Sequence, residues 1–151
     1  MGRQDEFNIR VIKKYFLYEH TVSFEETNVV GNVYFANHVR WQGKCREMFL
    51  LEHCPEVLED INGTLRLVTL KVSCDYYEEL HAFDELKIRM RLVENVAHRI
   101  VLGFEYFKVQ DGDERLAAAG RQEIGCMRLN EGLMKPCSIP AYLSEALKPF
   151  A

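Results

Sequence analysis

The second half of the sequence consists almost entirely of segments in which apolar and polar residues alternate. These segments lie at residues 68–76, 86–92, 100–106 and 115–129. Such alternation is typical of β-strands with one buried face. An Asp111-Gly112 pair, which is typical of a tight hairpin, separates the last two segments. We therefore expect four consecutive strands joined mostly by hairpins, which form an antiparallel sheet.

The first half of the sequence adds one strand and one long helix. Residues 15–24 alternate and predict a half-buried strand, residues 25–32 predict a loop, and residues 33–53 show helical spacing of apolar residues. Residues 55–63 predict a connector with a short helical turn, and residues 142–147 a short surface helix. This order predicts an α+β domain in which a five-stranded antiparallel sheet wraps around one long central helix.

The composition bounds the class of protein. The chain has 151 residues, of which 48% are hydrophobic, and it has no repeat or linker. We therefore expect one domain at 15–151, preceded by a flexible tail at 1–14. The net charge of -4 argues against nucleic-acid binding. No apolar run is long enough to cross a membrane, and five scattered cysteines fit a reduced, cytoplasmic location.

The usual catalytic motifs are absent from the sequence. It contains no Gly-x-Ser-x-Gly, no phosphate-binding loop and no His-Glu-x-x-His. The five histidines lack the spacing of metal ligands, so we expect them at strand ends or on the surface. We accordingly predict no metal and no cofactor.

One charged residue falls on the apolar stripe of the predicted helix. Phe35, Val39, Gln42, Arg46 and Phe49 follow one another at helical spacing, which places Arg46 on the face expected to be buried. A guanidinium does not lose its proton on burial and therefore needs an accepting partner. This partner is either a glutamate, in a structural ion pair, or a ligand. Alternatively, the Arg46 side chain itself extends past the edge of the sheet.

Gly43 lies one turn earlier on the same side of this helix. A glycine inside a helix costs about 0.5–1 kcal/mol relative to alanine, so it usually serves close packing or leaves space. Both interpretations stay open at this point. Four small residues at 117–120 on the last predicted strand suit a close approach to the helix.

Residues 26–41 carry a recognisable pattern, Glu-Thr-Asn-Val-Val-Gly-Asn-Val-Tyr-Phe-Ala-Asn-His-Val-Arg-Trp. This segment resembles the strand-loop-helix signature of the hotdog-fold thioesterases of the 4-hydroxybenzoyl-CoA thioesterase type. The resemblance covers residues 15–129 and implies a hotdog fold with thioester hydrolase activity. Members of that family polarise the thioester carbonyl with a backbone N–H at the helix start, which here corresponds to Phe35, with Tyr34 beside it.

The sequence departs from the family pattern at two positions. The catalytic aspartate of the family falls on Asn28, and a helix position that is glutamate in many relatives falls on Gly43. Neither residue can act as a carboxylate base or nucleophile. Together with Arg46, this combination resembles the enediyne-biosynthesis thioesterases, which release a polyene from the acyl carrier protein domain of an iterative polyketide synthase. The resemblance implies catalytic roles for Asn28 and Arg46.

The resemblance also implies a substrate, a channel and an assembly. A β-ketoacyl thioester would give an acid prone to lose CO2. Gly31 would allow the sharp turn before the helix, and Tyr34, Val39, Gly43 and Thr69 are candidates for the channel wall, although Thr69 also fits an ordinary strand residue. We expect a homodimer and, beyond it, a tetramer. Two alternatives are a general acyl-CoA or acyl-carrier-protein thioesterase and a non-catalytic acyl-binding module.

Overall fold

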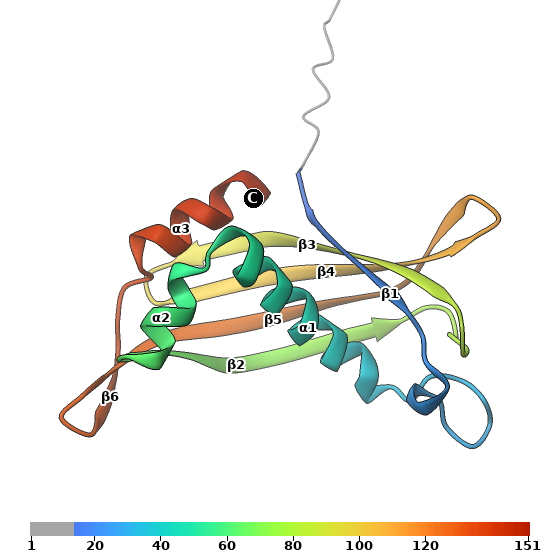
Figure 1. The fold of residues 1–151 in the computed structure, drawn as a ribbon, viewed down its shortest axis with the longest axis horizontal. Coiled ribbons are helices and arrows are strands. Elements are labelled where there is room, and N and C mark those ends of the chain that lie inside the picture. Colours follow the sequence, from blue (N-terminus) through green and yellow to red (C-terminus); the bar gives the residue numbers. More distant parts are fainter. Residues whose placement is uncertain (1–13) are drawn as a thin grey trace, which may run out of the picture.

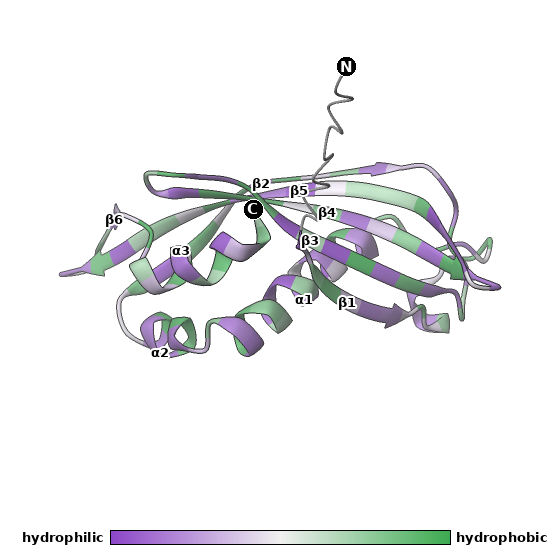
Figure 2. Ribbon diagram, turned by 90° about the horizontal axis from the view of Figure 1, so that it is seen from above, coloured by the Kyte–Doolittle hydropathy of each residue, from purple (hydrophilic) through white to green (hydrophobic). Residues whose placement is uncertain are grey.

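The computed structural model describes residues 14–151, so the tail predicted at 1–14 lies outside the described residues except for Lys14. Within the described part, one antiparallel sheet carries three α-helices on the same side (Figures 1 and 2). The strands are β1 (Phe16–Thr21), β2 (Leu65–Tyr76), β3 (Glu85–Val96), β4 (Arg99–Gln110), β5 (Asp113–Asn130) and β6 (Leu133–Pro136). The helices are α1 (Ala36–His53), α2 (Glu56–Asn62) and α3 (Ala141–Leu147), with 3₁₀ turns η1 (Phe24–Glu26) and η2 (Lys148–Phe150).

The sheet order is β1-β3-β4-β5-β2, and β6 pairs with β5. Every pairing is antiparallel, as the sequence predicts. The inward-facing residues of β3 and β4 are buried under α1, which confirms the alternation seen in the sequence. These residues are Leu86, Ile88, Met90, Ile100, Leu102, Phe104 and Tyr106. The α+β class is therefore confirmed, and β2 forms one edge of the sheet, with no strand of the described residues on its outer side.

Two strand predictions need correction. The first strand ends at Thr21 and not at Phe24, because the chain turns into η1, where the Phe24 side chain is exposed. The short strand β6 was not predicted, since all four of its residues are exposed and its last residue is a proline. The predicted hairpin is present: Asp111 and Gly112 have φ angles of 52° and 80°, as a type I′ turn requires.

Helix α1 begins later than predicted, and only part of the predicted stripe is buried. It starts at Ala36, and Val33 instead forms a bridge with Thr27. Phe35 precedes the helix and is 61% exposed, and Val39 is half-buried. The prediction of a buried stripe through these two residues is therefore wrong. The buried residues of α1 are Asn37, His38, Trp41, Gln42, Cys45, Phe49 and Leu50.

Gly120 allows α1 to approach β5 closely, as the small residues at 117–120 suggested. A Cβ atom at Gly120 would lie 2.2 Å from Gln42 Nε2 and 2.5 Å from the Ser73 carbonyl oxygen. The Gln42 side chain, fully buried, occupies that space and donates a hydrogen bond of 3.1 Å to the same carbonyl. Glycine at this position is thus required by close packing of a helix side chain on the sheet.

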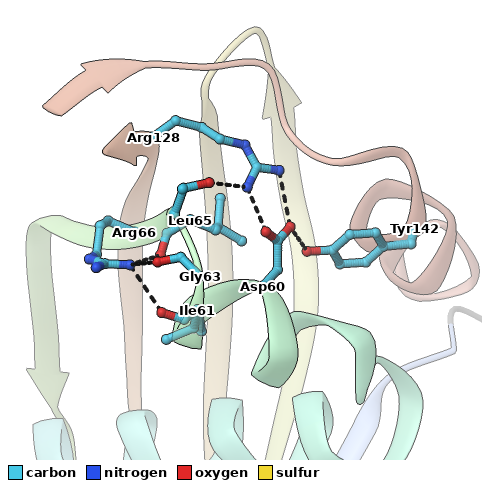
Figure 3. Close-up of polar contacts among 8 residues, drawn as sticks. Asp60, Ile61, Gly63, Leu65, Arg66, Arg128 and Tyr142 are labelled. Atoms are coloured by element: carbon cyan, nitrogen blue, oxygen red, sulfur yellow. Dashed lines mark hydrogen bonds and ion pairs between the residues drawn. The ribbon is translucent and has the colours of Figure 1, made fainter. Parts of the chain in front are cut away.

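A polar cluster attaches α3 to α2 and β5 (Figure 3). Arg128 on β5 makes two hydrogen bonds, of 2.5 and 3.0 Å, to the carboxylate of Asp60 on α2, and Tyr142 on α3 donates a third of 2.5 Å. The bond from Arg128 is the main cause of the lowered pKa of Asp60. Leu143 and Leu147 on the inner side of α3 are 2% exposed. The C-terminal helix predicted at 142–147 therefore covers the end of the core.

Candidate active site

The loop between η1 and α1 is shaped by Asn28 and Gly31. The Asn28 Oδ1 atom accepts a hydrogen bond of 3.0 Å from the Val30 N–H, and the Asn28 carbonyl accepts one of 2.9 Å from the Gly31 N–H. Gly31 has a φ angle of 90°, a conformation that favours glycine. Asn28 itself is exposed, and its Nδ2 group makes no hydrogen bond to any described residue. The loop therefore presents an amide donor at the surface.

The start of α1 offers a second donor. Two hydrogen bonds join this segment to the Glu26 carbonyl, one of 3.0 Å from the Tyr34 N–H and one of 2.8 Å from Asn37 Nδ2. The Tyr76 hydroxyl donates a hydrogen bond of 2.8 Å to the Phe35 carbonyl. The Phe35 N–H has no hydrogen-bond partner within residues 14–151. A free N–H at a helix N-terminus favours negative charge, so this amide can donate a hydrogen bond to an oxyanion.

A hollow of about 270 Å³ adjoins the Phe35 peptide. Its lining residues are Asn32, Val33, Phe35, His38, Tyr76, Tyr77, Glu78, Glu79 and Leu80. Glu78 pairs with Arg115, and Glu79 accepts a hydrogen bond of 3.3 Å from Asn32 Nδ2. The residues that line the hollow thus include two glutamates and Phe35, whose N–H has no hydrogen-bond partner among the described residues.

His38 lies in the wall of this hollow and is 3% exposed, so the prediction that all histidines lie at strand ends or on the surface is wrong for this one. Its ring contacts those of Tyr76, Trp41 and Tyr106. Neither ring nitrogen has a hydrogen-bond partner among the described residues. Desolvation lowers the pKa of His38 to about 4, although the Phe35 carbonyl opposes the shift. The imidazole is therefore neutral near pH 7.

Arg46 lies on the third turn of α1, half-buried against the sheet. Its Nη1 atom donates a hydrogen bond of 3.2 Å to Oε1 of Gln122, a 4% exposed residue on β5. No carboxylate of residues 14–151 lies within ion-pair distance of the guanidinium. Desolvation lowers the pKa of Arg46, and the nearby Glu47 charge offsets part of that effect. Arg46 therefore keeps a positive charge that its amide partner does not neutralise, which excludes the structural ion pair.

The Arg46 side chain borders a small apolar cavity of about 20 Å³. The other lining residues come from α1, β2, β4, β5 and α3: Phe49, Leu50, Leu67, Ile100, Leu102, Ile124, Leu143 and Leu147. A cavity of this volume has room for about one water molecule, so a hydrocarbon chain can enter beside Arg46 only if the surrounding apolar side chains move apart.

The remaining predicted residues lie around these features. A Cβ atom at Gly43 would meet no atom within 4 Å, so this glycine leaves space and does not serve close packing within the chain. Thr69 is exposed on β2 and pairs with Ile124, whose side chain is buried on the helix side. Directly paired residues point to the same face, so Thr69 lies on the helix side of this edge strand. Tyr34 is 50% exposed beside Phe35.

The comparisons with known proteins agree with the fold described above. Residues 22–147 match the model of the thioesterase-like superfamily. This chain belongs to that superfamily. It is 43% identical to the dynemicin thioesterase, with a TM-score of 0.87 over 91% of this chain and 98% of the other.

More distant thioesterases share the fold. A 1,4-dihydroxy-2-naphthoyl-CoA thioesterase from Synechocystis is 22% identical, with a TM-score of 0.76 over 89% of this chain and 96% of the other. A mutant 4-hydroxybenzoyl-CoA thioesterase, complexed with 4-hydroxybenzoyl-CoA, is 14% identical, with a TM-score of 0.75 over 91% of this chain and 99% of the other. The resemblance inferred from residues 26–41 is confirmed, and the protein is a thioester hydrolase.

The thioesterase chain does not bring all its predicted site residues together. Asn28, Gly31, Tyr34 and Phe35 all lie in the loop that leads into α1. Arg46 lies ten residues further along the helix than Ala36, which is about 15 Å at 1.5 Å per residue. The hollow beside Phe35 and the cavity beside Arg46 have no lining residue in common. Within one copy, the two groups of predicted residues are therefore separate.

Sequence reasoning missed Gln122 and Tyr76 as partners of the site. Gln122 and Ile124 are two residues apart on β5 and therefore point to the same, inward face. A polar residue on this buried face was a signal in the sequence. Tyr76 gave no comparable signal, because its hydroxyl reaches Phe35 across 41 residues of sequence.

None of the described helices is long and apolar enough to cross a membrane. The described residues also contain no cluster of three or more His, Cys, Asp or Glu suited to a metal.

Proposed function

We propose that this thioesterase hydrolyses a β-ketoacyl polyene thioester presented by an acyl carrier protein domain of an iterative polyketide synthase. The 43% identical dynemicin thioesterase binds a polyene, which supports this substrate class. The observation that carries the proposal is the guanidinium of Arg46, whose partner is a neutral amide and which borders an apolar cavity.

The charge on Arg46 fits a β-ketoacyl group better than a simple acyl chain. A buried cation without an acid partner costs free energy in the folded protein. A β-keto oxygen, or the oxyanion formed from the thioester, offers a strong acceptor for that cation. In this proposal the apolar residues around the small cavity move apart when the substrate binds and then contact its hydrocarbon part.

The hydrolysis follows from the groups at the start of α1. Water attacks the thioester carbonyl carbon and releases a proton to solvent, and the Phe35 N–H stabilises the oxyanion that forms. Asn28 orients the water through its side-chain amide. The C–S bond then breaks, and the thiolate takes a proton from solvent. The β-keto acid formed can lose CO2 and gain a proton at the adjacent carbon to give a methyl ketone.

A second copy of the chain completes the site in this proposal. The outer edge of β2 pairs with no other strand of residues 14–151, and exposed apolar residues surround it and the loop before α1. These residues are Val29, Val30, Phe35, Leu70, Tyr76 and Tyr77. Pairing of two β2 edges would bring the Asn28 end of one copy toward the Arg46 region of the other. We propose a homodimer as the active unit and a tetramer formed from two dimers.

Mixed dimers test this arrangement. Asn28→Ala and Arg46→Ala are each expected to be nearly inactive. Refolding the two variants together should restore activity, because one of the two sites in a mixed dimer has both native residues. Light scattering should show a dimer or tetramer. A stable monomer with full activity would contradict the shared site.

The substrate test compares two thioesters that differ in the β-keto group. The proposal predicts faster hydrolysis of a β-ketoacyl carrier-protein thioester than of a simple acyl-CoA of equal length, with CO2 and a methyl ketone as products. Equal rates would favour a general acyl thioesterase. Tight binding without release of free thiol would indicate an acyl-binding module.

Two further variants test the role of carboxylates. Asn28→Asp introduces the carboxylate of the wider family, and its rate shows whether ordinary aspartate chemistry works in this site. Glu79→Gln removes a carboxylate from the residues that line the hollow. We expect an unchanged rate for Glu79→Gln, and a loss of about 100-fold or more would identify Glu79 as the general base.

A further inference from the structure

The carboxylate of Glu26 accepts four hydrogen bonds at the end of η1. Oε1 accepts from the Ser23 N–H at 2.8 Å, from Ser23 Oγ at 3.0 Å and from His20 Nε2 at 2.9 Å. Oε2 accepts from Trp41 Nε1 at 2.6 Å. The Glu26 side chain is 16% exposed. One carboxylate therefore connects β1, η1 and the second turn of α1.

The backbone of the same residue makes two further connections. The Glu26 carbonyl accepts hydrogen bonds from the Tyr34 N–H and from Asn37 Nδ2. Tyr34 directly precedes Phe35, and Glu26 lies two residues before Asn28. The ends of the loop that carries Asn28 are therefore both held by Glu26, one through covalent connection and one through hydrogen bonds.

The arrangement keeps Glu26 ionised. Desolvation acts to raise its pKa, but the hydrogen bonds from Ser23, Trp41 and His20 outweigh this effect, and the pKa is lowered. Hydrogen bonds to a charged acceptor are shorter and stronger than neutral ones, which suits a fixed anchor. With all four donors on its two oxygens, this carboxylate is engaged in holding the loop and is a poor candidate for a base.

We propose that Glu26 is a positioning residue for thioester hydrolysis, because it fixes the loop of Asn28 relative to the free Phe35 amide at the start of α1. This inference rests on the proposed function, in which those two groups act on the same substrate. A shift of about 1 Å in a positioned group can reduce a rate by about 100-fold. Glu26 therefore acts on the rate through Asn28 and Phe35 without touching the substrate.

The test uses Glu26→Gln in the full chain, with Glu25→Gln as the matched control. Glu25 is the adjacent, exposed residue of η1 and makes no side-chain hydrogen bond within the described residues. Glutamine keeps the size of Glu26 but replaces one acceptor oxygen by a donor, so it cannot accept from all four groups. We expect kcat to fall about 10- to 100-fold with little change in KM, while Glu25→Gln retains the wild-type kcat.

Trp41→Phe provides a second variant in case Glu26→Gln does not fold. It removes the single hydrogen bond to Oε2 and leaves the carboxylate in place. A fall in kcat of about 3- to 10-fold is expected, measured well below the unfolding midpoint.

A double-mutant cycle separates positioning from a purely structural role. If Glu26 acts through Asn28, the effect of Glu26→Gln on kcat should shrink at least several-fold in the Asn28→Ala background. Loss of thermal stability with an unchanged kcat, or the same fold loss in both backgrounds, would overturn the inference. A wild-type protein that hydrolyses no thioester would instead refute the proposed function, and this inference with it.

Discussion

The buried imidazole of His38 should make the stability of this thioesterase depend on pH in a way that one substitution removes. His38→Phe keeps an aromatic ring among Tyr76, Trp41 and Tyr106 and loses no hydrogen bond of the described residues, because both ring nitrogens lack partners. The variant therefore isolates the contribution that protonation of His38 makes to the unfolding free energy.

The magnitude follows from the two pKa values. The pKa of His38 is 6.5 in the unfolded chain and about 4 in the folded protein. As the pH falls below 6.5, the unfolded chain takes up a proton that the folded protein does not, so the native state loses stability. By about pH 4.5 this loss reaches about 2.5 kcal/mol, and below the folded pKa it stops growing.

Urea unfolding of wild type and His38→Phe, at one fixed protein concentration because the protein is expected to be oligomeric, measures this effect. The difference in unfolding free energy between the two proteins should change by about 2 to 3 kcal/mol between about pH 7.5 and about pH 4.5. All other titrating groups are common to both proteins and cancel. A change of less than about 0.5 kcal/mol would show that the ring is solvated, and would refute the reasoning.

Three substitutions test how the helices pack on the sheet and on one another. Gly43→Ala should raise the unfolding free energy, measured with urea, by about 0.5–1 kcal/mol, since a Cβ meets no atom of the described residues within 4 Å. A lower unfolding free energy would show that another copy of the chain fills this position in the assembly. Gly120→Ala should lower it by about 1–3 kcal/mol, because the new Cβ would overlap Gln42 Nε2, and an unchanged value would contradict this contact. Tyr142→Phe removes one hydrogen bond to Asp60 and should cost about 1 kcal/mol in the same assay; no change would show that the cluster does not hold α3.

The sheet could be predicted from the sequence because its signals are local. Alternation in β3 and β4 reports which side chains face the core, and Asp111-Gly112 specifies its own turn. The strand β6 gave no such signal, since none of its residues is buried. The resemblance at residues 26–41 identified the family for a similar reason, because the loop and helix start form one contiguous segment.

The buried face of α1 could not be predicted in the same way. Asn37, His38 and Gln42 occupy part of that face, so the apolar pattern is weak and a stripe through Phe35 fits it falsely. These polar residues are buried because hydrogen bonds or aromatic contacts from distant strands accommodate them, as Ser73 does for Gln42. Sequence spacing contains no information on such contacts.

The partner of Arg46 was unpredictable for the same physical reason. The spacing of α1 indicated that the guanidinium faces the sheet, and the structure places it there half-buried. The choice between a glutamate and an amide depends on Gln122, which is 76 residues away in sequence. The proposed function depends on this partner, because a glutamate would have neutralised the charge of Arg46.

Single-turnover hydrolysis of a β-ketoacyl carrier-protein thioester by Arg46→Met tests the central claim most directly. Methionine retains the apolar contacts of the Arg46 stem and removes its charge. The account predicts a rate about 100- to 1,000-fold below wild type in a folded, oligomeric protein, with Arg40→Met, an exposed arginine of the same helix, at the wild-type rate. A wild-type rate for Arg46→Met would contradict the claim that this cation takes part in the reaction.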